Sequence, residues 1–569
     1  MRAVRIITEV GAIDRPFDYA LSESMSQCGV GDRVRVNLNN RSVRGWVIGE
    51  AEATRELKPV VKWLGYGPPP ALLELLEWAS WRWFSPLSRF LISSSPHRLV
   101  TVLPERPLAQ ALARSVATTA QRAEAGVLQC SPTADPLPLI LGAYEATRDR
   151  GGSLLVLVPT EAWANRLRGR LEQRGVRVAS GDAEWDRMRA GWPVVVGARG
   201  TALAPVPMVA GAIMVDADDE TYRSEASPTW DAFTMLVERC RRENAPLWAT
   251  TMIPSPELVA SRTYEKYGDI ARGWPQVRVI DRRNTDPRDG VLSRDALDAA
   301  HKALSGDEPI AVAVVLQRLG TGRLFACRSC GELARCAQCG QAELEVDGQL
   351  LCRDGHEPRA NFCRSCGATN LKPVRVGVST LARDVAAQLG QAVSEVTGAS
   401  DHSSELARVV VGTEAIWQRV RRCGVVIFVD FDQYLLAARD SSRRAAIRAV
   451  GKAGRLVGAR SEGRGVVVVQ TRRGEDGVIR ALERGEFDEI VHDDIETARL
   501  LALTPFGAKA RLSGEAAGEF AERLASAGTS VRVYGDRDGF EVRSSDVASL
   551  IGALRSVERP TGRLRVAVE

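Results

Sequence analysis

Residues 327–366 read CRSCGELARCAQCGQAELEVDGQLLCRDGHEPRANFCRSC and hold seven of the eleven cysteines of this 569-residue chain. The spacing is Cys327-x2-Cys330-x5-Cys336-x2-Cys339, then Cys352-x3-His356, then Cys363-x2-Cys366. Each close pair can place two thiolates on one turn, about 2.3 Å from a single metal ion. Eight ligands make two tetrahedral sites, which we assign as Cys327, Cys330, Cys363 and Cys366 for the first and Cys336, Cys339, Cys352 and His356 for the second. Both are expected to be structural, because no ligand position is left open for catalysis.

Zinc is the expected metal, two ions per chain, since tetrahedral sets of soft thiolates select zinc or iron–sulfur clusters. An iron–sulfur cluster therefore stays open as an alternative. A disulfide framework is disfavoured, because the N-terminal segment MRAVRIITEV carries no secretory signal and close Cys pairs in a reducing compartment favour metal. The alternative for His356 is a loop residue, which would leave the second site one ligand short.

The composition limits the kind of protein this is. A chain of 569 residues is long enough for several domains, and its net charge of +5 permits nucleic-acid binding without requiring it. Local basic patches, not net charge, must support such binding. No run approaches the ~18 apolar residues of a membrane span. We therefore expect a soluble, cytoplasmic protein with no membrane partner.

The N-terminal part, residues 1–103, is expected to be a small β domain followed by a helix. Short strand patterns with intervening turns lie at Val4, Ile6, 31–36 and 45–48. Helical periodicity runs over 72–84, and its Trp78, Trp81 and Trp83 are interpreted as core residues rather than as platforms for bases. Residues 104–125 are expected to be a linker, helical over the Ala- and Arg-rich part at 108–125.

From residue 126 the sequence alternates apolar strand patterns with helical patterns. The first set of strands is Leu154–Val158, Val194–Gly197, Ala212–Asp216, Leu247–Thr251 and Val277–Ile280, and the second is Ile310–Leu316, Val409–Gly412, Val425–Asp430 and Val466–Gln470. Near-continuous Val, Ile and Leu runs separated by helices indicate parallel strands buried on both faces. We expect an α/β multidomain protein with lobes at 126–290 and 291–500, a zinc-binding insertion at 325–373 in the second lobe, and an α+β domain at 501–569.

This organisation resembles the PriA family of bacterial replication-restart proteins (primosomal protein N′). The matching pieces are the Cys pattern followed by Gly367-Ala368-Thr369-Asn370-Leu371 and Gly377-Val378-Ser379-Thr380, together with Phe17-Asp18-Tyr19, Gly31-Asp32-Arg33-Val34-Arg35-Val36, Gly197-Ala198-Arg199, Gly412-Thr413-Glu414 and Thr504-Pro505. The resemblance implies two RecA-like helicase lobes and binding to DNA forks, D-loops and 3′ ends. It also implies partners: other primosome proteins, the replicative helicase and single-strand binding protein.

The chain departs from this family where ATP chemistry requires particular residues. A P-loop needs Gly, a Lys for the β- and γ-phosphates and a Ser or Thr for Mg²⁺. The corresponding stretch, Gln129-Cys130-Ser131-Pro132-Thr133-Ala134-Asp135-Pro136, has no Gly, and Asp135 stands where the Lys is expected. The metal-and-base motif appears as Asp216-Ala217-Asp218-Asp219, without its Glu. The arginine-finger motif is partly kept in Gly451-Lys452-Ala453-Gly454-Arg455.

We therefore expect a helicase-deficient, actinobacterial-type member that binds branched or forked DNA and helps to load the replicative helicase, without ATPase or helicase activity and without bound ATP. Two alternatives remain open. One is a residual ATP-dependent 3′-to-5′ DNA helicase that uses a rearranged site. The other is a protein-interaction scaffold with no direct role at DNA.

The resemblance implies a pocket for a DNA 3′ end at Phe17, Asp18, Asn39 and Lys58. Phe17 would stack on the terminal base, Asp18 would accept from the 3′-hydroxyl and Lys58 would pair with a phosphate. Asn39 replaces the family's Gly, and Asn tolerates positive φ better than most residues. The alternative is that Phe17 is a core aromatic and Lys58 a solvated charge.

Two further surfaces are candidates for binding. Arg444, Arg448, Lys452 and Arg455 recur at helical spacing and could follow a phosphate backbone, although a solvated helix face is an equal alternative. The zinc insertion is expected to dock other primosome proteins, on resemblance alone.

Overall fold

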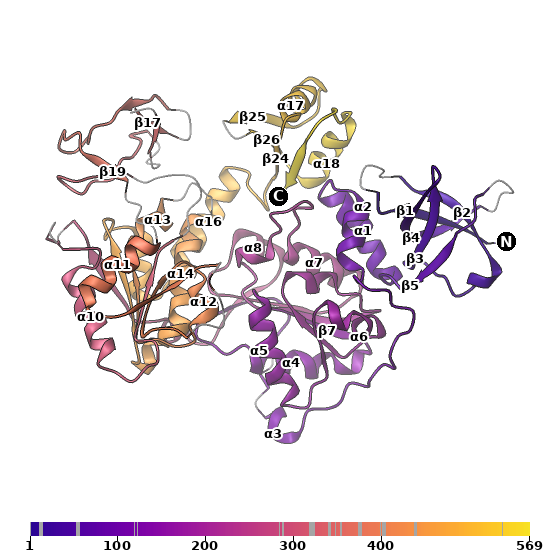
Figure 1. Cartoon of the computed structure of the whole chain (residues 1–569), viewed down its shortest axis with the longest axis horizontal. Coiled ribbons are helices and arrows are strands. Elements are labelled where there is room, and N and C mark those ends of the chain that lie inside the picture. The colour runs from indigo at the N-terminus through magenta and orange to yellow at the C-terminus, as the bar shows by residue number, and fades with distance from the viewer. Residues whose placement is uncertain are drawn as a thin grey trace. The chain divides into compact units, whose positions relative to one another are not determined.

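The computed structural model of the chain divides into two compact units (Figure 1). Unit 1 comprises Met1–Leu128, Asp135–Glu265 and Asp494–Glu569, and unit 2 comprises Gln129–Ala134 and Lys266–Asp493. The residues that the structure describes are 2–10, 15–52, 57–118, 120–121, 123–283, 285–286, 289–317, 325–338, 343–346, 349–352, 356–373, 378–398, 400, 405–436, 441–536 and 539–569.

An antiparallel five-stranded sheet forms the N-terminal part of unit 1. Its order is β2-β1-β4-β3-β5, with β1 at Arg2–Thr8, β2 at Phe17–Leu21, β3 at Arg33–Leu38, β4 at Arg41–Ala51 and β5 at Lys62–Gly65. Alternate residues such as Val4, Ile6 and Val34 point inward and are fully buried, as a period of two requires. The segment before β5 links the two sides of the sheet, because Val60 N donates to Ala20 O and Val61 N donates to Arg35 O, each at 2.9 Å. The sheet is thereby closed into a small barrel.

Helices α1 (Pro70–Arg82) and α2 (Leu87–Ser94) follow the barrel. The apolar face of α1 is buried, and Trp83 directly after it is 2% exposed. Trp78 and Trp81 are half-buried and pack against the same core, which agrees with a structural role for this aromatic group.

The first lobe is a seven-stranded sheet of order β12-β6-β11-β10-β7-β9-β8. Its strands are β6 (Val127–Cys130), β7 (Ser153–Leu157), β8 (Val178–Ala179), β9 (Val194–Gly197), β10 (Val209–Met214), β11 (Leu247–Thr251) and β12 (Tyr264–Tyr267). Its helices are α4 (Leu137–Thr147), α5 (Glu161–Glu172), α6 (Trp185–Ala190), α7 (Ala232–Arg242) and α8 (Pro256–Ser261). Strands β11, β10, β7, β9 and β8 pair in parallel, as expected for runs that are buried on both faces.

The second lobe is an all-parallel six-stranded sheet of order β13-β23-β22-β14-β21-β20. Its strands are β13 (Val277–Asp281), β14 (Val312–Val315), β20 (Val393–Val396), β21 (Val409–Gly412), β22 (Val425–Phe428) and β23 (Val466–Thr471). Its helices are α9 (Ile270–Gly273), α10 (Arg294–Leu304), α11 (Val378–Leu389), α12 (Ile416–Arg419), α13 (Asp432–Leu435), α14 (Ser442–Val457) and α15 (Gly477–Arg484), and α16 (Asp488–Leu500) runs across the boundary between the units.

Two small β modules complete the chain. The cysteine-rich insertion holds β15 (Phe325–Cys327) paired with β19 (Leu371–Pro373), and a three-stranded sheet of β16 (Glu343–Val346), β17 (Gln349–Cys352) and β18 (Arg359–Ala360). The C-terminal domain is a four-stranded sheet of order β25-β26-β24-β27, with β24 at Ala508–Ser513, β25 at Arg532–Asp536, β26 at Gly539–Ser544 and β27 at Arg565–Val568, and helices α17 (Ala517–Ser526) and α18 (Val547–Ser556). Short 3₁₀ turns lie at Glu23–Met25, Arg148–Arg150, Asp182–Glu184, Arg199–Leu203, Glu220–Tyr222 and Arg460–Glu462.

Two expectations about the middle of the chain are corrected. The strand at Val277–Ile280 is expected in the first lobe, but the observed strand β13 pairs with β23 in the second sheet. An apolar run identifies a strand without indicating which sheet it joins. Of the helix expected over 108–125, the described residues contain only α3 (Arg114–Ala117). Ala and Arg favour helix, but a short helix without a buried apolar face is marginal in water.

Across the described part of the chain, none of the helices combines the length and the apolar character needed to cross a bilayer.

Candidate DNA-binding pocket and metal centres

Phe17 and Asp18 are the first two residues of β2, the first strand in the order of the N-terminal sheet. Both side chains are half-buried: Phe17 packs partly against the barrel core, and the Arg15 guanidinium lies 5.1 Å from the centroid of its ring. The Asp18 carboxylate accepts from Arg5 on the neighbouring strand, Nε to Oδ1 at 3.0 Å and Nη2 to Oδ2 at 3.4 Å. Each carboxylate oxygen has a second lone pair, so Asp18 can still accept from a hydroxyl while it is held in place.

Asn39 lies in the tight turn between β3 and β4. Asn39 and Asn40 have φ of 47° and 61°, between the paired residues Leu38 and Arg41. Positive φ at both central positions belongs to the hairpin turn that matches strand twist, and Asn is among the few side chains that adopt it. The family's Gly is therefore replaced here without loss of the backbone conformation expected at this position.

Lys58 is exposed, and its backbone carbonyl accepts from Ala20 N of β2 at 2.9 Å. The hydroxyl of Tyr19 donates to the carbonyl of Asn37 at 3.2 Å, two residues before Asn39. Strand β2 is thus tied both to Lys58 and to the start of the Asn39 turn. These contacts join β2, which carries Phe17 and Asp18, to the backbone of Lys58 and to Asn37, two residues before Asn39. Arg5, Arg15 and Tyr19 contact Asp18, Phe17 and Asn37, respectively, and the sequence alone does not indicate these neighbours.

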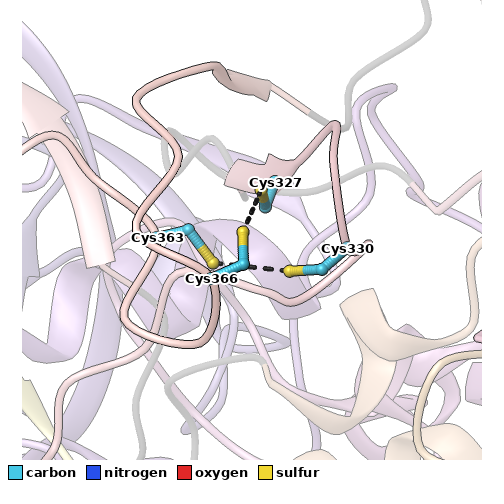
Figure 2. A group of neighbouring side chains, drawn as sticks. All are labelled: Cys327, Cys330, Cys363 and Cys366. Carbon is cyan, nitrogen blue, oxygen red and sulfur yellow. Dashed lines mark hydrogen bonds between the residues drawn. The ribbon is translucent and has the colours of Figure 1, made fainter.

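The thiols of Cys327, Cys330, Cys363 and Cys366 point toward one another from two knuckles of the insertion (Figure 2). Sγ of Cys327 lies 3.5 Å from that of Cys366, and Sγ of Cys330 lies 3.5 Å from that of Cys363. Each knuckle is a Cys-x2-Cys-Gly turn whose Gly, Gly331 or Gly367, has φ near 75° and donates its N–H to the carbonyl of the first Cys. The positive φ is the conformation that Gly adopts without steric cost.

The second group contains Cys336, Cys352 and His356. His356 Nδ1 lies 3.4 Å from Sγ of Cys336 and 3.4 Å from Sγ of Cys352. His356 is therefore positioned as a ligand rather than as a remote loop residue. The expected fourth ligand, Cys339, lies outside the described residues.

These separations fit a tetrahedral metal ion. With sulfur ligands about 2.3 Å from zinc and nitrogen at about 2.0–2.1 Å, neighbouring ligand atoms lie ~3.8 Å apart for two sulfurs and ~3.6 Å for sulfur and nitrogen. The observed values of 3.4–3.5 Å are close to both. They are far from the ~2.05 Å of a disulfide, and the ten described cysteines are all unbridged. Both groups could hold zinc.

A buried ion pair supports the second metal group. Arg359 Nε lies 2.9 Å and 2.8 Å from the two carboxylate oxygens of Glu343, and a second guanidinium nitrogen also contacts Glu343. Arg359 also donates to Phe362 O at 2.6 Å and lies over the Phe362 ring. Because β16 carries Glu343 and β18 carries Arg359, the pair joins the two strands that flank β17 and its ligand Cys352.

Residues of the stretch that corresponds to a P-loop form hydrogen bonds and ion pairs with other residues of the protein. In unit 1, Asp135 Oδ1 accepts from Leu137 N at 3.1 Å, and the carboxylate pairs with Arg170, Nη1 to Oδ1 at 2.9 Å. Burial raises the pKa of Asp135, but the hydrogen bonds from Arg170 and Leu137 outweigh it and hold the pKa below its ordinary value. A carboxylate thus lies at the N-terminus of α4, where a P-loop would place a phosphate.

The earlier half of that stretch packs within unit 2. Pro132 O accepts from Arg455 Nε at 2.9 Å, and Thr133 Oγ1 donates to Gly273 O at 2.7 Å. Ser131 lies so close to Gly273 that a Cβ there would come within 2.2 Å of Ser131 Oγ. Arg455, the counterpart of the arginine finger, therefore uses its Nε to hold the loop's backbone.

The Asp216-Ala217-Asp218-Asp219 motif serves local structure. Asp218 Oδ1 accepts from Thr251 Oγ1 at 2.7 Å, and Asp219 Oδ1 accepts from Thr221 N at 3.0 Å and Oγ1 at 2.8 Å. Asp216 is 5% exposed and has φ of 53°. Within the described residues, groups with metal-ligand spacing are found only in the cysteine-rich insertion.

The basic stripe expected on α14 is corrected. Arg444 and Arg448 are 8% and 6% exposed, and Lys452 and Arg455 are half-buried. Most other residues of α14 are buried as well, so the helix offers no continuous exposed basic face. Arginine stems pack against apolar neighbours as readily as they reach solvent, and spacing alone does not distinguish the two.

Comparison with known proteins identifies the N-terminal domain and relatives of the longer chain. The family model of the PriA 3′ DNA-binding domain matches residues 5–96. Replication restart protein PriA of Treponema pallidum is 24% identical, over 87% of this chain and 84% of its own. PriA proteins of Thermotoga maritima and Synechocystis sp. are each 23% identical over 63% of this chain, which spans only 52% and 48% of their lengths.

Solved helicase structures are more distant. Saccharomyces cerevisiae Dbp5 bound to RNA and ADP BeF3 is 10% identical over 66% of this chain and 90% of its own, with a TM-score of 0.36. The Mycobacterium smegmatis helicase Lhr bound to single-stranded DNA and AMP-PNP is 12% identical over 76% of this chain and 58% of its own, with a TM-score of 0.35. Scores this low support no inference about activity. Residues 5–96 thus match the 3′ DNA-binding domain of PriA, and most of the sequence is similar to replication restart protein PriA.

Proposed function

We propose that this protein binds branched or forked DNA by capturing a 3′ end in its N-terminal domain, and that it serves replication restart as a scaffold without ATPase or helicase activity. The observation that carries the DNA half is the match of residues 5–96 to a 3′ DNA-binding domain. Asp18 supplies an acceptor for a 3′-hydroxyl, Phe17 an aromatic face for the terminal base and Lys58 an exposed cation for a phosphate.

The second half of the proposal concerns the missing ATP chemistry. Asp135 places a negative carboxylate at the start of α4, and Pro132 and Pro136 have no N–H to offer a phosphate. Arg455, which would act on a transferring phosphoryl, donates through its Nε to Pro132 O. The side chains of Asp218 and Asp219 accept from nearby threonines. All four features disfavour a bound nucleotide with its Mg²⁺.

The metal module and the partners complete the proposal. Two zinc ions would hold the insertion through Cys327, Cys330, Cys363 and Cys366 and through Cys336, Cys339, Cys352 and His356. A rigid module of this kind would present a docking surface for other primosome proteins, which with single-strand binding protein and the replicative helicase are the proposed partners.

The DNA half is tested by fluorescence anisotropy on forks whose nascent strand ends in a 3′-hydroxyl or a 3′-phosphate. The wild type should prefer the hydroxyl. Asp18→Asn and Lys58→Met should each weaken hydroxyl-fork binding about 10-fold or more, as loss of a hydrogen bond to a charged group predicts. Asp18→Asn should also remove the preference.

The matched control is Glu50→Gln. Glu50 forms an exposed ion pair with Arg2 of β1, just as Asp18 pairs with Arg5 of the same strand. It should leave the preference intact. Wild-type discrimination in the Asp18→Asn variant would refute 3′-end capture by this pocket. Saturable heat on titrating ATP with Mg²⁺ in the presence of forked DNA would refute the loss of nucleotide binding.

A further inference from the structure

Three cations occupy opposed positions on the adjacent strands β4, β3 and β5 of the N-terminal sheet; Figure 1 shows these strands. Arg35 of β3 is directly opposite Arg44 of β4 on one side and Lys62 of β5 on the other. All three are exposed, whereas the flanking Val34 and Val36 are fully buried. Residues that face one another across an antiparallel pair project from the same side of the sheet. Arg44, Arg35 and Lys62 therefore form a continuous cation row on the outside of the barrel.

Such a row is unfavourable in the isolated protein. Like charges directly opposite each other destabilise a pair of strands. Arg44 is neutralised by Glu9, Nε to carboxylate at 2.9 Å. No acidic side chain within the described residues pairs with Arg35 or Lys62. Arrangements of this kind are stabilised when an anion bridges the cations.

The cation row leads toward the proposed 3′-end pocket. Asn37 is exposed on the same face of β3 as Arg35, and Asn39 follows two residues later in the turn. Along the neighbouring segment, Lys58 precedes Lys62 by four residues. Four extended residues span at most about 13 Å, and one strand of B-form DNA passes a phosphate about every 3.4 Å. A strand whose end is in the pocket would thus bring a phosphate over the row within about four nucleotides.

We propose that the cation row binds the phosphodiester backbone of the strand that ends in the pocket, upstream of its 3′ terminus. This rests on the proposed function, since it assumes that DNA occupies the pocket. The row reads charge and not sequence, so it should add affinity equally for any base composition and for either chemistry at the 3′ end.

The test is a salt titration of fork binding by the full chain with Arg35→Gln/Lys62→Gln. Each cation that neutralises a phosphate makes the negative slope of log K against log salt steeper by about 0.9. Loss of two such cations in the double variant should therefore reduce the steepness of this slope by about 1.8. Its affinity at low salt should fall about equally for 3′-hydroxyl and 3′-phosphate forks. The thermal midpoint should not fall, because the substitutions relieve repulsion.

The matched control is Arg2→Gln/Arg89→Gln, which removes two exposed cations of the same domain outside the row. It should keep the wild-type slope. The proposal is overturned if the row variant keeps the wild-type slope, if the control lowers the slope as much, or if the loss is confined to the 3′-hydroxyl fork. The first and second of these results leave 3′-end capture standing. A separate result would refute 3′-end capture: equal binding of 3′-hydroxyl and 3′-phosphate forks by the wild type.

Discussion

Substituting Glu343 by Gln tests how closely the buried ion pair of the insertion is coupled to metal binding. The side chains of Glu343 and Arg359 are only 3% and 10% exposed. Glu343→Gln removes the negative partner and leaves the Arg359 cation buried. Breaking a buried pair from one side costs about 3–5 kcal/mol. The same change costs little in an exposed pair.

This cost should appear as weaker zinc binding. In small metal modules the free energy of binding is largely the free energy of folding, because the site does not exist in the unfolded segment. At 1.4 kcal/mol per factor of ten, a loss of 3–5 kcal/mol corresponds to a zinc affinity lowered by about 10² to several 10³-fold. The effect should be largest at the Cys336, Cys352 and His356 site, since β17 lies between the two strands that the pair joins.

The assay is competition between the full chain and a chromophoric chelator, which resolves the two zinc ions by affinity. One class of zinc should be lost at much lower chelator concentration in Glu343→Gln, and the other should shift less. Replacing both partners by Met should restore most of the affinity, because a buried pair can be exchanged for apolar residues at little cost. Glu519→Gln, which breaks an exposed Arg–Glu pair in the C-terminal domain, is the control. Two zinc ions held with wild-type affinity by Glu343→Gln would refute the coupling.

Two further predictions concern the stretch that replaces the P-loop. Asp135→Asn should lower stability to urea at pH 7, and this effect should fade as the pH is lowered below the ordinary Asp pKa of about 3.9. A carboxyl whose folded pKa is lowered stabilises above its ordinary pKa, and that contribution is lost as the pH falls through the lowered value. An equal effect at pH 7 and below the ordinary Asp pKa would contradict the role given to Arg170. Gly273→Ala should cost about 1–3 kcal/mol, because its Cβ would meet Ser131 Oγ at 2.2 Å. The control Gly169→Ala has open space around it inside α5 and should stabilise by ~0.5–1 kcal/mol in thermal unfolding; a harmless Gly273→Ala would show that the loop does not pack there.

Local patterns in the sequence predict much of this structure. The Cys-x2-Cys pairs bring ligands together because each knuckle closes within five residues, and the apolar runs at 154–158 and 409–412 become parallel strands because each is buried on both faces. These local patterns do not predict which residues that are distant in the sequence come into contact. The ion pair between Arg5 and Asp18, and the alignment of Arg35 with Arg44 and Lys62, follow from strand register, which no periodicity specifies.

The basic residues of α14 show that spacing also does not predict whether a helix face is buried. Their spacing of three to four residues correctly identifies a helix, but it does not predict an exposed face, because Arg444 and Arg448 are buried. Periodicity reports that residues share a helix face, and charge alone does not place that face in solvent.

The start of α4 gives a reason, beyond the absence of one Lys, for our proposal that the altered loop does not bind phosphate. A helix N-terminus attracts an anion through the N–H groups of its first turn, which have no partner inside the helix. Here Pro138 in that turn has no N–H, and Leu137 N already donates to Asp135. The Asp135 carboxylate is thus the helix's own anion, and Arg170 neutralises it. A phosphate would have to displace a bound carboxylate to reach fewer donors than a P-loop provides. The residues that we propose to exclude a nucleotide therefore also provide the partners of the helix terminus.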